Sequence, residues 1–176
     1  DEADVELLTL KRERRWREFL ERCVLNRKNV IIAGATGSGK TTFARSLIDK
    51  VPLHERIVTM EDVHELKLKH PNWVATIYGR GVGQVAPKDC LEAAMRMSPS
   101  RIFPAELRGD EAWPYICSLN TGHPGSVTTT HASSAIETYS RVFTLAKSSD
   151  VGRNLDSELI RNDLYKTVHV TLYFEK

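Results

Sequence analysis

The order of apolar and polar positions predicts strands that alternate with helices along most of the chain. Short apolar runs predict the strands, and apolar residues spaced three or four apart predict the helices between them. The predicted strands cover 29–34, 56–60, 72–79, 101–107, 126–132 and 167–174. Helices that follow the first strand are predicted over 40–51, 87–97, 110–122, 134–146 and 156–166. This alternation is typical of an α/β domain with a mainly parallel sheet flanked by helices.

A further helix is predicted before the first strand, in the stretch LLTLKRERRWREFLERCVLNRKN. Four apolar residues there have the i, i+3, i+4, i+7 spacing of one buried helix face: Trp16, Phe19, Leu20 and Cys23. Most Lys and Arg residues fall elsewhere, interleaved with glutamates, which favours a solvated face over contact with an anionic membrane surface. We therefore expect a linker-like helix over 1–28 and one α/β domain over 29–176.

Composition fits one globular domain and narrows the class of partner. The 176 residues are 41% hydrophobic and 27% charged, enough to bury a core without disulfides. With 25 basic and 23 acidic residues the net charge is only +2, so DNA contact is not indicated. The three cysteines are widely spaced, which favours a reducing compartment over a disulfide framework. No apolar run approaches the ~18 residues of a membrane span, so we expect no integral membrane segment.

The stretch GATGSGKT, from Gly34 to Thr41, matches the phosphate-binding pattern G-x-x-x-x-G-K-[ST]. It stands between a predicted strand and a predicted helix, which is the context that the motif requires. We expect Lys40 to bridge the β- and γ-phosphates of ATP, and the Thr41 hydroxyl to ligate Mg²⁺. The expected nucleotide-binding residues of this loop are Gly34, Ala35, Thr36, Gly37, Ser38, Gly39, Lys40, Thr41 and Thr42.

Acidic side chains follow two predicted strands, at the edge of a parallel sheet where ligands bind. VTMEDVHEL contains Glu61, Asp62 and Glu65, and RIFPAELRGDEA contains Glu106 and Arg108. A carboxylate directly after a buried strand is costly unless it is paired or linked to a metal, which favours Glu61 and Glu106 as site residues. Asp62 and Glu65 could instead cap a helix.

The stretch NTGHPGSVTTTHA places two histidines eight positions apart. With no convincing third ligand nearby, they make a poor zinc site. His131 ends a predicted strand, where an imidazole N–H could reach a phosphate oxygen, so we expect a γ-phosphate sensor there. The hydroxyl of Thr130 could shift with His131 when phosphate leaves. His123 and Pro124 could simply build the turn before the strand.

Taken in order, four segments resemble the secretion traffic ATPases, the hexameric motors of type IV secretion and conjugation with pilus-retraction and type II secretion relatives. The segments are GATGSGKTT, TMEDVHEL, AAMRMSPSRIFPAELRGDEA and NTGHPGSVTTTHA, which together span 34–132. Glu-Leu-Arg-Gly followed by Gly-His-Pro-Gly and Thr-x-His-Ala is the most diagnostic part. The secretion and conjugation motors resemble the chain most, since it has no tetracysteine insertion of the type II kind.

The resemblance implies a RecA-like P-loop fold, ATP hydrolysis with Mg²⁺, and a hexamer. It also implies a cytoplasmic location at the bacterial inner membrane, beside other secretion components. By position, Glu61 would activate the attacking water and Glu106 would hold Mg²⁺ through water. His131 would contact the γ-phosphate, and His123 would help to shape that loop.

The resemblance also suggests, less specifically, roles for Arg108 and Arg80. They would couple charges between the acidic and histidine segments or across subunits. The chain also departs from the family. Pro104 occupies a strand position that is usually aliphatic, and proline is unexpected in a central strand. Ser100 replaces the usual aspartate before that strand. The resemblance also implies an N-terminal domain before the phosphate-binding loop, and we expect only a linker-like helix in its place within this sequence.

Other functions remain as alternatives. A pilus-retraction or type II secretion ATPase shares the same segments. A small P-loop kinase would require a mobile arginine-rich lid and a pocket for the phosphate acceptor, and the sequence shows no segment of either kind. A nucleotide-gated DNA-binding module would bind with a steep dependence on salt, which the near-neutral charge disfavours.

Overall fold

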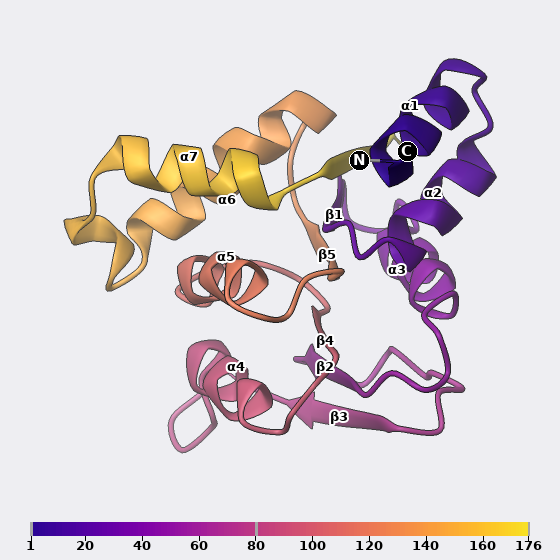
Figure 1. The fold of residues 1–176 in the computed structure, drawn as a ribbon. Helices are drawn as coiled ribbons and strands as arrows, with labels where there is room; N and C mark the ends of the chain where they lie inside the picture. The colour runs from indigo at the N-terminus through magenta and orange to yellow at the C-terminus, as the bar shows by residue number, and fades with distance from the viewer. Residues whose placement is uncertain (1, 80, 176) are drawn as a thin grey trace.

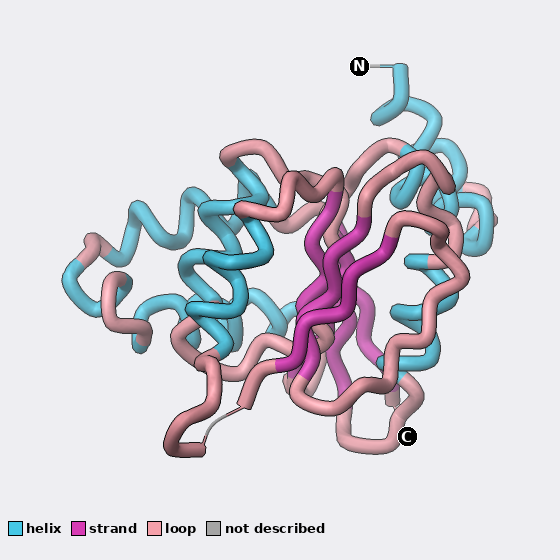
Figure 2. The backbone as a smooth tube through the Cα atoms, turned by 90° about the horizontal axis from the view of Figure 1, so that it is seen from below, coloured by secondary structure: helices cyan, strands magenta, loops and turns pink. Residues whose placement is uncertain are grey.

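The computed structural model describes residues 2–79 and 81–175, and its strands form a central layer between helices (Figure 1; Figure 2). The strands are β1 Val30–Gly34, β2 Ile57–Glu61, β3 Trp73–Ile77, β4 Arg101–Pro104, β5 Val127–Thr130 and β6 Val170–Phe174. The helices are α1 Glu2–Arg12, α2 Trp16–Leu25, α3 Lys40–Ile48, α4 Pro87–Met95, α5 Ala112–Asn120, α6 Ala135–Ser148 and α7 Ser157–Thr167, with a 3-10 turn η1 at Gly152–Asn154. The α/β class and all the predicted strands are confirmed.

All strand pairs in the described residues are parallel, in two ladders ordered β3-β2-β4 and β5-β1-β6. A single parallel bridge between Glu106 and Thr129 joins the two ladders. The six strands therefore follow one another as β3-β2-β4-β5-β1-β6. Their carboxyl ends share one edge, which is where a doubly covered parallel sheet binds ligands.

Two apolar clusters cover the two faces of the sheet. Ile31 belongs to a cluster with residues of α4 to α7, whereas Val30 and Ile32 belong to a cluster with residues of α1, α2 and α3. This division follows from the alternation of side chains along a strand. Because both faces are covered, β1 is apolar at every position, as the sequence pattern indicated.

The N-terminal prediction of one continuous helix is wrong. Helix α1 ends at Arg12 and α2 begins at Trp16, and between them Arg14 adopts a left-handed backbone with φ 57°. The four residues of the predicted apolar face all lie within α2, and Phe19, Leu20 and Cys23 pack on the core as expected. Cys23 is buried, but Trp16 is 50% exposed. Figure 1 shows α1 and α2 side by side on the helical layer next to β1 and α3.

The two departures near β4 have structural explanations. Pro104 is the last residue of β4, at the junction between the two ladders. The next amide, Ala105 N, donates to Met60 O of β2 at 2.8 Å, so the Pro104 nitrogen faces β5 instead. Since no ladder forms on that side, proline removes no bond that β4 makes to β2. Ser100 Oγ accepts from Arg56 N at 3.0 Å and thereby joins the starts of β4 and β2.

Candidate nucleotide site

A pocket of about 510 Å³ lies at the carboxyl edge of the sheet and brings together all four sequence segments. Its lining includes Thr36, Gly37, Gly39, Lys40, Thr41 and Thr42 from the P-loop, with Asp62, Val63, Glu65, Ala105, Glu106, Arg108, Thr129 and His131 from the other three. The predicted convergence of these segments is therefore observed. Most of the polar lining comes from the loops that follow β1, β2, β4 and β5.

Positive backbone φ angles at glycines, among them Gly34 and Gly39, shape the P-loop. Gly34 has φ 148°, and a Cβ there would lie 2.4 Å from Phe174 O of the neighbouring strand β6. Gly39 has φ 89° and precedes the first residue of α3. Only glycine adopts such angles without strain. The N-terminus of α3 thus opens on the pocket with free N–H groups and the positive end of the helix dipole, which favours phosphate.

The side chain of Lys40 lies against the P-loop itself. Its Nζ donates to Gly34 O at 2.8 Å and to Ala35 O at 2.7 Å. Burial lowers the pKa of Lys40, an effect that the charge of Glu106 opposes and that of Arg108 reinforces. An ammonium group bound only by neutral carbonyls would bind more strongly to phosphate oxygens, because these carry full negative charge.

Arg108 and His131 contact the carboxylate of Glu106 from two directions. Its Oε2 accepts from Arg108 at 2.6 Å, and Arg108 also donates to Asp62 at 2.8 Å. The hydrogen bond with Glu106 is the main cause that raises the pKa of Arg108. His131 Nε2 lies 3.0 Å from Glu106 Oε1, and His131 Nδ1 lies 3.1 Å from Gly34 O. His131 therefore connects the Glu106 carboxylate to the P-loop.

The oxygens around the pocket fit a magnesium ion. Among the described residues, buried Glu106 Oε1 has no hydrogen-bond partner, although His131 Nε2 is close. Both ring nitrogens of His131 lie near oxygen atoms, Nδ1 near Gly34 O and Nε2 near Glu106 Oε1, and which nitrogen donates depends on the tautomer. An unsatisfied carboxylate oxygen and the Thr41 hydroxyl are ligand types that Mg²⁺ prefers, together with water and phosphate oxygens.

No group of three or more His, Cys, Asp or Glu side chains in the described ranges is arranged to hold a metal ion unaided. This is compatible with Mg²⁺, which usually binds through one or two protein oxygens plus substrate phosphates. The donor set thus suits an ion that arrives with a nucleotide.

The structure does not bring Glu61 to the pocket. Its side chain is fully buried, and its Oε1 accepts from Glu65 N at 2.9 Å and from Leu66 N at 2.6 Å. Its Oε2 lies 3.3 Å from His64 Nδ1 and 3.4 Å from Thr59 Oγ1. In this conformation Glu61 anchors the loop after β2 rather than facing an attacking water. Its catalytic role stays a prediction.

Asp62 and Glu65, by contrast, both line the pocket. The alternative interpretation of these two residues as helix caps is wrong, because residues 62–72 form no helix. Asp62 instead joins the ion-pair network of the site through Arg108, at 2.8 Å.

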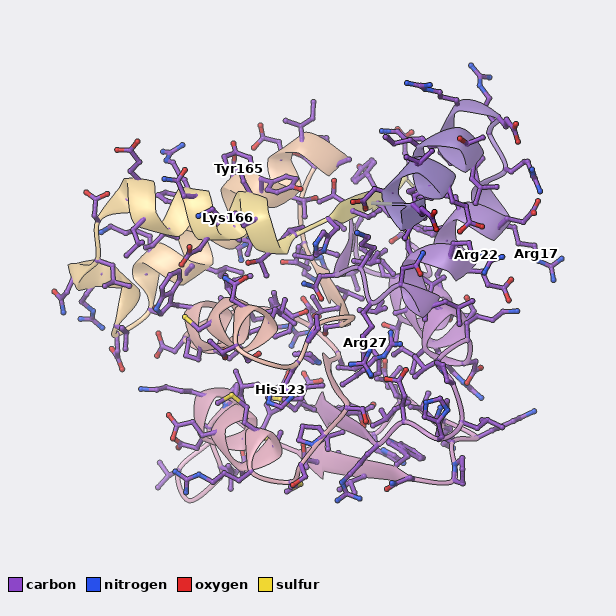
Figure 3. All side chains as sticks on the ribbon, viewed as in Figure 1. Arg17, Arg22, Arg27, His123, Tyr165 and Lys166 are labelled. Carbon is purple, nitrogen blue, oxygen red and sulfur yellow. The ribbon has the colours of Figure 1, made fainter. Side chains whose placement is uncertain are left out.

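His123 also lies outside the pocket lining, in the connection from α5 to β5 (Figure 3). Its Nδ1 is 3.2 Å from Pro99 O, a contact that holds this connection near the start of β4. That is the opposite edge of the sheet from the phosphate loop, so the expectation that His123 shapes the phosphate site is corrected. The turn-building interpretation fits its position. Arg80 lies outside the described residues.

Thr130 was expected to respond to phosphate together with His131. Of the two neighbouring threonines of β5, however, Thr129 lines the pocket and Thr130 does not. Thr130 is fully buried, and its Oγ1 donates to Leu107 O at 3.2 Å. Side chains alternate along a strand, so Thr129 lies on the same side as His131. That alternation was the signal in the sequence that could have identified it.

A P-loop between a central strand and a helix, with a carboxylate, a histidine and an arginine gathered at the same sheet edge, defines a P-loop NTPase of the RecA-like fold. Comparison with known proteins gives the family. The chain belongs to the type II/IV secretion system protein family, whose sequence model matches residues 2–169.

Relatives within this family include type IV secretion components. The chain is 46% identical over 155 residues to the type IV secretion system protein VirB11 of Bartonella quintana, covering 86% of this chain and 44% of that protein. The crystal structure of the Brucella suis VirB11 ATPase in complex with sulphate superposes with TM-score 0.91 at 40% identity, covering 97% of this chain and 50% of that one. The pilus retraction motor PilT with bound ADP gives TM-score 0.66 at 28% identity, covering 83% and 41%. The chain thus spans about half the length of these relatives.

Proposed function

We propose that this chain is the RecA-like motor domain of a hexameric bacterial type IV secretion or conjugation ATPase, which hydrolyses ATP to power macromolecule transport or pilus assembly. The observation that carries the proposal is the convergence of Lys40, Glu106 and His131 on one P-loop. Lys40 and His131 both contact Gly34 O, and His131 also lies against Glu106. This cluster places a carboxylate of the kind that P-loop enzymes use to hold Mg²⁺ during hydrolysis beside the phosphate-binding loop.

The residues of the pocket divide the work of ATP binding. The N–H groups of the P-loop and of α3 would hold the β-phosphate, and Lys40 would leave the two carbonyls for the β- and γ-phosphates. Thr41 and, through water, Glu106 would hold Mg²⁺, which neutralises phosphate charge when it is bound. His131 would detect the γ-phosphate, because that phosphate lies next to Glu106 at the same edge.

Activation of the attacking water remains assigned to Glu61, as the family resemblance implies. This role requires the loop 62–66 to release the Glu61 carboxylate, since both its oxygens are engaged within that loop and β2. Arg108 would serve as the counter-ion that holds Glu106 and Asp62 together before Mg²⁺ arrives.

The comparisons support the type IV assignment over pilus retraction, because identity and TM-score are both higher for the VirB11 proteins than for PilT. On this proposal the cofactors are ATP or ADP with Mg²⁺. The chain would form a ring with further copies at the cytoplasmic side of the inner membrane, beside other secretion components. No helix in the described residues is long and apolar enough to cross a membrane.

Product analysis tests the proposed reaction. The chain is incubated with ATP and Mg²⁺, and free phosphate and phosphorylated acceptors are both measured. We expect free phosphate and ADP, with loss of both in Lys40→Ala. A phosphorylated acceptor in place of free phosphate would indicate a kinase and contradict the proposal.

A further inference from the structure

The Glu106 carboxylate, which we propose holds Mg²⁺ through water, follows β4 at the place where neighbouring strands share the least backbone pairing. Strands β4 and β5 are neighbours, but in the described residues only the Glu106–Thr129 bridge joins them by backbone pairing. Pro104 contributes to this gap, because it has no N–H to donate toward β5. The backbone around Glu106 therefore lacks the ladder that fixes residues within β1 or β2.

Side-chain hydroxyls of the β5 segment take the place of the missing ladder. Ser126 Oγ donates to Ile102 O at 2.6 Å near the start of β4. Thr129 Oγ1 donates to Ala105 O at 2.7 Å near its end. Thr129 O in addition accepts from Leu107 N at 2.9 Å. One residue of β5 thus binds the residue before Glu106 and the residue after it.

We propose that Thr129 is the positioning residue for Glu106, and that its hydroxyl, by holding Ala105 O where only one bridge joins β4 and β5, sets the carboxylate for the Mg²⁺–nucleotide complex. The inference rests on the proposed function, since it assigns how the metal-binding carboxylate of that site is oriented. Residues behind a metal ligand commonly control its geometry and the affinity of the site.

The side-chain contacts of Glu106 with Arg108 and His131 are less suited than Thr129 to fix the position of its backbone and carboxylate. The side chains of Arg108 and His131 are 40% and 43% exposed, and both are ionic or titratable partners that a bound nucleotide would engage. Thr129 is only 2% exposed, and its two hydrogen bonds to the segment around Glu106 are to backbone atoms. A buried contact to backbone persists whether or not phosphate is bound.

The preceding residue of the same strand provides a matched control. Thr128 is 1% exposed, and within the described part of the chain its Oγ1 has no hydrogen-bond partner. It lies outside the pocket lining. Thr128→Val therefore removes a buried hydroxyl that holds nothing, whereas Thr129→Val removes one that holds Ala105 O. Both changes keep the branched shape of the side chain.

The test measures the affinity of this chain for a fluorescent ATP analogue with Mg²⁺ and with EDTA. We expect Thr129→Val to weaken the affinity measured with Mg²⁺ about tenfold more than the affinity measured with EDTA, and to speed amide exchange at Leu107. Thr129→Ser, which keeps the hydroxyl, should restore the Mg²⁺ dependence, and Thr128→Val should resemble the unmodified chain. If Thr129→Val does not fold, Thr129→Ser compared with Thr129→Ala carries the same test.

The outcomes separate the two proposals. Equal Mg²⁺ dependence in Thr129→Val and the unmodified chain would overturn the positioning inference and leave the proposed function intact. An equal loss of affinity with and without Mg²⁺ would show a merely structural role and would also overturn it. An unmodified chain that binds no nucleotide under either condition would contradict the proposed function and the inference with it.

Discussion

Lys40 illustrates how single residues determine the properties of this site. It is 7% exposed, and it is bound by two carbonyls of the loop that it would use to hold phosphate. The motif predicted its place, because glycine and lysine spacing defines the P-loop. The buried orientation of Glu61 was not predictable in the same way. It depends on hydrogen bonds to Glu65 N and Leu66 N, whose loop geometry no local pattern encodes.

Replacement of Lys40 by alanine should weaken binding of ATP by about tenfold to a hundredfold, the value of a charge-assisted hydrogen bond to phosphate. The fold should be retained, since the two carbonyls that Lys40 binds can turn to water at the pocket. Titration with a fluorescent nucleotide measures the affinity. Lys50→Ala serves as the control, because Lys50 lies on the surface and pairs with Glu21 at 3.4 Å. Equal affinity of the two variants would contradict the role of Lys40.

At the scale of elements, buried polar residues tie the ladders and helices together at the edge away from the pocket. Arg101 is fully buried at the start of β4 and makes paired contacts to Glu55 at 2.8 Å. It also donates to Val24 O at 2.7 Å and to Gly125 O at 3.2 Å. The apolar pattern predicted the strand but could not show that its first residue joins α2, β4 and the β5 turn.

Arg101→Leu should lower the free energy of unfolding by about 3 kcal/mol or more, because it leaves the buried Glu55 with fewer partners. Urea denaturation measures this loss. The surface pair Arg153–Asp150 provides the comparison, and Arg153→Leu should change stability by less than about 1 kcal/mol. Similar losses of unfolding free energy in Arg101→Leu and Arg153→Leu would show that the buried Arg101–Glu55 pair contributes no more to stability than a surface pair.

The start of β6 should make stability depend on pH. His169 Nδ1 accepts from Asn29 N at 2.9 Å, which requires a ring without a proton on that nitrogen. The residue is partly exposed, and partial burial of the ring, aided by the charge of Lys28 and opposed by that of Asp4, lowers the pKa of His169 below its usual 6.5. Folding thus favours the neutral ring, so this contribution is present above the unfolded pKa and is lost as pH falls through the folded pKa.

We therefore expect the free energy of unfolding to fall as pH is lowered below about 6.5, the unfolded pKa, toward the lower folded pKa, and His169→Gln to reduce that slope. Urea denaturation at several pH values measures the slope, with the exposed His54→Gln as the control. An unchanged slope in His169→Gln would contradict this origin of the pH dependence.

For the whole molecule, the pocket lies across the junction between the two ladders. The ladder β5-β1-β6 leads into the P-loop and His131, and the ladder β3-β2-β4 leads into Asp62, Glu106 and Arg108. The alternation of strands and helices along the sequence predicted the parallel sheet, and the motifs predicted which segments meet at the pocket. The division into two ladders was not predictable, because it arises from tertiary pairing around Pro104.

The chain spans about half the length of the relatives that form the basis of the proposed ring. We expect the 176-residue chain alone to bind nucleotide weakly and to remain monomeric or loosely associated. Light scattering with and without ATP measures its mass. A stable ring combined with tight binding would contradict this expectation.

The most direct test of the account is the rate of phosphate release from ATP by His131→Ala and by His123→Ala. The two histidines come from one sequence segment, but only His131 lines the pocket. Loss of His131 should slow release on the order of a hundredfold, comparable to the loss of one preorganised donor in an active site. Loss of His123 should leave the rate close to that of the unmodified chain. Equal rates in both variants would contradict a phosphate-sensing site at this edge of the sheet.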